Sequence, residues 1–108
     1  MTINEYQSEA NATAIYPDSS SLTYPALGLA GEAGEICNKV KKIIRDEGGT
    51  VSEEKRNALI DELGDVFWYL AAIAKDLKVT LDEVARRNIE KLSSRQKRGK
   101  IGGSGDNR

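Results

Sequence analysis

The sequence repeats part of itself at an offset of 30 residues. Residues 31–43, GEAGEICNKVKKI, align with residues 61–73, DELGDVFWYLAAI, so that acidic, glycine and apolar positions coincide. In each copy the apolar residues recur at the spacing of one face of an α-helix. The pattern predicts two similar amphipathic helices, which a short connection would pack antiparallel. Gly34 and Gly64 each cost about 1 kcal/mol relative to alanine within a helix, so they predict close approach of another backbone or a ligand.

Start and stop signals extend this pattern to four helices and an all-α fold. Serine, threonine and capping-box residues mark helix beginnings, because their side chains bond the free N–H groups of the first turn. Gly48 and Gly49 mark the end of the second helix, since glycine readily adopts the left-handed conformation found there. The four predicted starting points are a capping box at residues 2–5, residue 25 or 26, a cap at Thr50 or Ser52, and a capping box at residues 80–83.

Length and charge limit the classes of protein that the chain can form. A chain of 108 residues is one domain, which we assign to residues 1–98, followed by a flexible glycine-rich tail at 99–108. Sixteen Lys and Arg residues against 17 Asp and Glu leave no basic field for a nucleic-acid partner. No signal peptide and no membrane-length apolar segment can be recognised, so we expect a cytoplasmic protein without a membrane partner.

Four carboxylates lie at equivalent positions on the same flank of the two apolar stripes: Glu32, Glu35, Glu62 and Asp65. Antiparallel packing would bring the two pairs together, and such crowding is unfavourable unless cations neutralise it. Oxygen-only ligands predict Mg²⁺, with Mn²⁺ as a possible substitute. The alternative is ordinary solvated charge, because acids at this spacing are common on exposed helix faces. The absence of histidine excludes di-iron Glu-x-x-His sites and Ser-His-Asp or Cys-His catalysis.

These residues resemble the signature of the MazG-like, all-α nucleoside triphosphate pyrophosphohydrolases, which is E-x-x-E, a variable spacer and E-x-x-D. The likeness extends through YPALGLAGEAGEICNKVKK and IDELGDVFWYLAAIA to the end of the chain. It implies a four-helix-bundle-like MazG fold in a homodimer or homotetramer. It also implies Mg²⁺-dependent hydrolysis of a (d)NTP to a (d)NMP and pyrophosphate, by water attack at the α-phosphorus, as house-cleaning of the nucleotide pool.

By position, the resemblance implies that the four acids are the ligands of the magnesium ions that bind the triphosphate. Many family members carry a further glutamate just before the first motif acid, proposed in some as the general base. Here that position is Gly31, so the resemblance does not identify the general base. Lys91 and Arg95 match the family's phosphate ligands, and Lys39 and Lys42 continue the acidic face of their helix. The alternative for all four cations is a solvated charge paired with a nearby acid.

Three further side chains are candidates for contact with the nucleotide. Tyr69 lies one turn beyond the last acid, where its ring could cover a base, its hydroxyl could contact the nucleotide, or the side chain could pack as a core aromatic. Asn88 shares a face with Lys91 and could bond the sugar or base, or simply be exposed. Trp68 lies off the apolar stripe and predicts a subunit contact or a base-stacking wall. Two other functions stay open: a phosphoribosyl-ATP pyrophosphohydrolase and a non-catalytic helical regulatory module.

Overall fold

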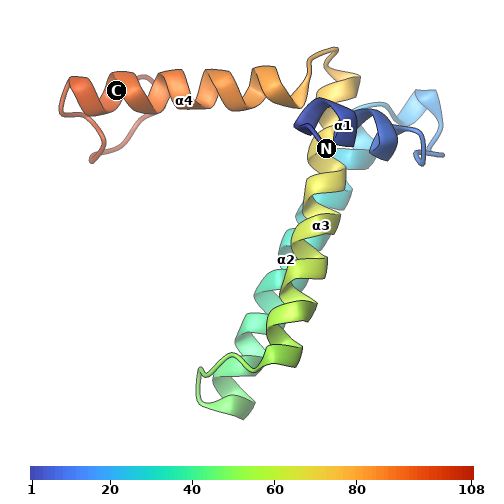
Figure 1. Cartoon of the computed structure of the whole chain (residues 1–108), viewed down its shortest axis with the longest axis vertical. Coiled ribbons are helices and arrows are strands. Elements are labelled where there is room, and N and C mark those ends of the chain that lie inside the picture. The colour runs from blue at the N-terminus through green and yellow to red at the C-terminus, as the bar shows by residue number, and fades with distance from the viewer.

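The structure is a computed structural model that describes residues 1–108, and it confirms the all-α prediction, with no strand. Figure 1 shows α2 and α3 as a long antiparallel hairpin, with α1 across its upper end. From that same end α4 extends away to one side, so that the hairpin and α4 form the two arms of an L (Figure 1). No helix has both the length and the apolar composition needed to span a membrane. The elements are α1 (Ile3–Asn11), the 3₁₀ turn η1 (Asp18–Ser20), α2 (Thr23–Glu47), α3 (Glu53–Asp76) and α4 (Leu81–Lys97).

The predicted caps begin three of the four helices. The side chains of Thr2, Ser52 and Thr80 each accept a hydrogen bond from the backbone N–H three residues further on. Gly48 ends α2 in the left-handed conformation, with φ 62°. Helix α1 ends at Asn11, because the N–H groups of Thr13 and Ala14 bond in the tighter i→i+3 pattern.

The core lies where α1 crosses α3. Half-buried Tyr6 and Phe67 pack beside it with their ring centroids 4.7 Å apart. The buried Gln7 amide donates to the Val79 carbonyl at 3.1 Å, and its oxygen accepts from the backbone N–H of Leu81 at 2.8 Å. These bonds fix α1 against the connection between α3 and α4. The buried cluster itself consists of Ala10, Ala71, Ala74 and Leu81.

The predicted apolar stripes are largely open to solvent in the single chain. Leu63 and Leu70 on α3 are 57% and 39% exposed, and Val40 on α2 is 41% exposed. Only nine of the 108 residues are buried. The reason is that α4 points away from the hairpin, so the face that a closed helical bundle would bury has no helix against it (Figure 1).

Residues 99–108 fold back against the end of α4. The Arg108 guanidinium donates to four backbone carbonyls within this segment. Arg95 of α4 donates to the Asp106 carbonyl at 2.7 Å and is buried there. The flexibility of the segment in solution stays a prediction.

Candidate metal centre

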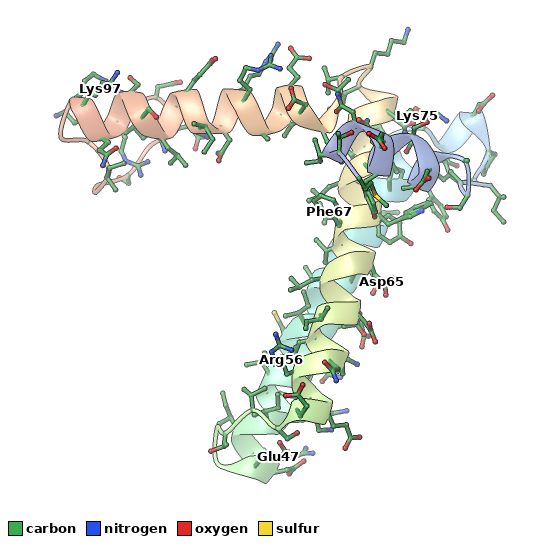
Figure 2. All side chains as sticks on the ribbon, in the orientation of Figure 1. Glu47, Arg56, Asp65, Phe67, Lys75 and Lys97 are labelled. Carbon is green, nitrogen blue, oxygen red and sulfur yellow. The ribbon has the colours of Figure 1, made fainter.

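Carboxylates from the two hairpin helices meet near the middle of the hairpin. One oxygen each from Glu32, Glu62 and Asp65 lies within 4.8 Å of the other two. Glu62 and Asp65 share a face of α3 because they are three residues apart, and the antiparallel packing brings Glu32 of α2 opposite them. Figure 2 shows Asp65 on the side of α3 away from the direction of α4. Glu35, three residues further along α2, is exposed and lies outside this cluster.

The carboxylates of the cluster lie close enough for their negative charges to repel one another. The pKa of Glu32 is raised from its ordinary value, first by desolvation and then by the neighbouring carboxylate of Glu62. The negative charges of Asp65, Glu62 and Glu35 raise it further. A cation placed among these oxygens would counteract this repulsion and lower the pKa of Glu32, since an opposite charge favours the ionised carboxylate.

Within the chain, the negative charge of Glu62 is only partly balanced by other side chains. Its Oε1 atom lies 3.1 Å from Nζ of Lys39, so this lysine is paired with a nearby acid. Its Oε2 atom is buried and has no hydrogen-bond partner. Because the available donors are all carboxylate oxygens and one is unsatisfied, the residues fit a hard divalent ion such as Mg²⁺ or Mn²⁺.

An open cavity of about 330 Å³ lies beside the carboxylates, lined by Glu32, Asp65, Trp68 and Tyr69. The two rings meet edge to face, with centroids 5.0 Å apart and planes at 83°. The Trp68 Nε1–H donates to the Thr13 hydroxyl at 2.8 Å, which fixes the indole. Trp68 and Tyr69 therefore give the acidic site an aromatic wall, of the kind on which a flat ring can stack.

Close packing against α2 holds Tyr69 in place. A Cβ atom at Gly28 would overlap the Tyr69 ring, so glycine is required there. By contrast, nothing lies within 4 Å of a Cβ atom placed at Gly34 or Gly64, so the close approach predicted there does not occur within one chain. Tyr24 extends the aromatic group, with its centroid 6.5 Å from that of Tyr69. Tyr24 was not among the residues predicted from the sequence, in which its only signal was its place next to Pro25, in the first turn of α2.

The remaining predicted ligands are not gathered at the cluster within one chain. Lys42 is exposed on α2. Asn88 and Lys91 share a face of α4, as predicted, and line a second open cavity of about 320 Å³ there. Arg95 bonds the C-terminal segment. Since α4 extends away from the hairpin, it does not carry these groups toward the acids of its own chain (Figure 1).

Comparisons with known proteins agree with this geometry. Residues 21–99 match the family model of the MazG nucleotide pyrophosphohydrolase domain. The Gene 37 protein of Mycobacterium phage L5 is 52% identical over 114 aligned positions, which cover 100% of both chains. No solved structure matches the chain. The matched range contains the carboxylate cluster, the aromatic wall and α4.

Proposed function

Because the chain belongs to the MazG nucleotide pyrophosphohydrolase family, we propose that it hydrolyses nucleoside triphosphates with Mg²⁺. The substrate is a (d)NTP, and the products are the (d)NMP and pyrophosphate. The proposed role is house-cleaning of the nucleotide pool in the cytoplasm, by a homo-oligomer. Mn²⁺ is expected to substitute for Mg²⁺, because both ions prefer oxygen ligands.

One observation carries the proposal: three carboxylate oxygens from two helices converge within 4.8 Å beside an open aromatic cavity. A surface cluster without a function would be expected to disperse its charges or to pair them. Here Lys39 pairs with only one oxygen of Glu62, while the second oxygen is buried without a partner. This arrangement favours a bound cation over ordinary surface charge.

In the proposed reaction, water attacks the α-phosphorus, the bond from that phosphorus to the bridging oxygen breaks, and pyrophosphate leaves. A divalent ion held by Glu32, Glu62 and Asp65, with Glu35 next to them, would neutralise phosphate charge and acidify water. The side chains of the protein would orient the substrate. Trp68 and Tyr69 provide a wall for the base or sugar, so that the triphosphate extends toward the carboxylates.

Cationic side chains complete the proposed site. Lys39, which forms an ion pair with Glu62, is a candidate to bind a phosphate oxygen in place of that carboxylate. Lys42, Lys91 and Arg95 are further candidate phosphate ligands, and Asn88 is a candidate for a hydrogen bond to the sugar or base. Position 31 has no side chain to accept the water's proton. That role is left to one of the clustered carboxylates.

The test is release of pyrophosphate from a panel of ribo- and deoxyribonucleoside triphosphates in Mg²⁺, Mn²⁺ or EDTA, with identification of the nucleotide product. We expect metal-dependent formation of monophosphate and pyrophosphate in equal amounts. Formation of diphosphate and orthophosphate would contradict attack at the α-phosphorus. No turnover of any nucleotide by the folded, metal-supplied protein would contradict the enzymatic proposal.

A further inference from the structure

We propose that Asp76 of α3 is a positioning residue that holds the aromatic wall of the nucleotide cavity in place. Its Oδ2 atom accepts a hydrogen bond from the Tyr16 hydroxyl at 2.9 Å and another from the Leu22 N–H at 2.7 Å. Both donors belong to the connection between α1 and α2, residues 12–22. A single carboxylate oxygen therefore joins this connection to α3. The inference rests on the proposed function, in which Trp68 and Tyr69 orient the nucleotide.

Leu22 needs a contact from outside its own turn to keep its conformation. Its φ of 65° and ψ of −48° lie in a region that residues with a Cβ atom rarely adopt. The Thr23 N–H donates to the Ser21 carbonyl at 2.7 Å, which makes Leu22 the central residue of a strained γ-turn with positive φ. Such a conformation persists only where the surrounding structure holds it. The hydrogen bond from the Leu22 N–H to Asp76 is a contact of this kind.

The turn at Leu22 determines where Tyr24 lies. Helix α2 begins at Thr23, so the direction in which the chain leaves the turn sets the direction of the first helical residues. The Tyr24 ring stacks on the Tyr16 ring, with centroids 4.8 Å apart and planes at 16°. Burial alone does not hold Tyr24, because it is 46% exposed. Asp76 therefore holds both rings, Tyr16 through its hydroxyl and Tyr24 through the turn.

This stacked pair lies next to the wall of the cavity. The Tyr24 centroid is 6.5 Å from that of Tyr69. Tyr69 and Asp76 share a face of α3, because their sequence separation corresponds to about two helical turns. The same connection also contacts Trp68, whose Nε1–H donates to the Thr13 hydroxyl at 2.8 Å. Both wall residues thus depend on the position of the connection, Trp68 directly and Tyr69 through Tyr24.

Asp76 acts through these contacts and not on the reacting groups. It follows Asp65 by three turns of α3, which is about 16 Å along a helix axis. A carboxylate at that distance does not reach a metal ion held by the clustered acids. Loss of Asp76 would let the wall shift relative to those acids, and we therefore expect weaker nucleotide binding with an unchanged chemical step.

The first test separates binding from chemistry, in steady-state hydrolysis of the triphosphate that the protein hydrolyses fastest with Mg²⁺. For Asp76→Ala, which removes the shared acceptor, we expect KM to rise about three- to tenfold while kcat stays within about twofold. Asp76→Asn keeps an acceptor oxygen and should restore most of the KM. The control is Ser52→Ala, which removes a side-chain acceptor of a backbone N–H at the other end of α3. Equal KM values for Asp76→Ala and Ser52→Ala, or a loss confined to kcat, would overturn the proposal.

A second test needs no turnover, so it distinguishes failure of this inference from failure of the proposed function. Trp68 is the only tryptophan of the chain, so its fluorescence reports on the wall. Acrylamide should quench it about twofold more strongly in Asp76→Ala than in the wild type, because the indole is held less firmly. Ser52→Ala should match the wild type. Unchanged quenching in Asp76→Ala would refute the positioning role, whereas increased quenching in a protein that hydrolyses no nucleotide would contradict the proposed function alone.

Tyr16→Phe keeps both tests decisive if Asp76→Ala does not fold. It removes one of the two hydrogen bonds to Asp76 and retains the ring that stacks on Tyr24. We expect smaller rises in KM and in quenching than for Asp76→Ala. In an Asp76→Ala background it should have no further effect, since the hydroxyl has already lost its acceptor. Wild-type KM and quenching in Tyr16→Phe, or additive effects of the two substitutions, would overturn the proposal.

Discussion

Lys39 on α2 forms an ion pair with Glu62 on α3, with Nζ 3.1 Å from Oε1. A metal ion entering the cluster must therefore compete with an ammonium group for this carboxylate. We predict that Lys39→Met increases the affinity of the nucleotide-free protein for Mg²⁺ by about 1.4-fold to fivefold, since a partly exposed pair contributes about 0.2–1 kcal/mol. Calorimetric titration measures the effect, and Lys42→Met is the matched control. Weaker Mg²⁺ binding by Lys39→Met would contradict the competition.

The geometry also predicts which of the four acids contribute most to activity. Glu62→Gln and Asp65→Asn remove oxygens from the cluster, so we expect each to reduce pyrophosphate release by roughly 100-fold or more. Glu35→Gln changes a carboxylate outside the cluster, and we expect a loss of about tenfold that higher Mg²⁺ concentration partly restores. Activity is measured on variants whose circular dichroism matches the wild type. An equal loss in all three, insensitive to Mg²⁺, would show that Glu35 is an equivalent ligand.

We expect substitution by alanine to have opposite effects on the free energy of unfolding at Gly28 and at Gly34. At Gly28 the new Cβ atom would overlap the Tyr69 ring, so Gly28→Ala should reduce the free energy of unfolding by about 1–3 kcal/mol. At Gly34 nothing lies within 4 Å, so Gly34→Ala should raise it by about 1 kcal/mol through helix propensity alone. Urea unfolding at one fixed protein concentration compares them. Destabilisation by Gly34→Ala would mean that another chain or a ligand approaches this glycine.

The sequence predicted the helices from local spacing, and it predicted three of the acids that meet in the carboxylate cluster from the internal repeat. Caps at Ser52 and Thr80 and the glycine at 48 act within a few residues, so the sequence alone indicates them. The repeat at an offset of 30 placed Glu32 opposite Glu62 once antiparallel packing was assumed. Membership of the cluster depends on the relative rotation of two helices, which the repeat does not specify, and Glu35 therefore lies outside it.

The features that the sequence did not predict depend on contacts between distant residues. Asp76 accepts hydrogen bonds from the Tyr16 hydroxyl at 2.9 Å and the Leu22 N–H at 2.7 Å, which fixes the segment before α2. No periodic pattern connects positions so far apart. The direction of α4 is likewise set by its connection to α3, so the sequence could identify Lys91 as a cation but could not locate it relative to the acids.

The raised pKa of Glu32 predicts how the stability of the metal-free protein changes with pH. The carboxyl keeps its proton in the folded state at pH values where the unfolded chain, with an ordinary pKa of 4.5, has lost it. The folded state then binds more protons, so the free energy of unfolding falls as pH rises through the interval above 4.5. Below that interval the stabilising contribution is fully present. Glu32→Gln has no such proton, so its stability in EDTA should fall less steeply there.

Magnesium should oppose this loss, because a bound cation favours ionised Glu32. We expect the stabilisation by Mg²⁺, measured as the difference in urea midpoint between Mg²⁺ and EDTA, to grow as pH rises above 4.5. At 100 times the dissociation constant it should reach about 2.7 kcal/mol. The growth with pH should be smaller in Glu32→Gln, whereas Asp18→Asn, which removes an acid outside the cluster, should behave as the wild type. Stabilisation that is independent of pH in the wild type would show that protons and Mg²⁺ do not compete for these carboxylates.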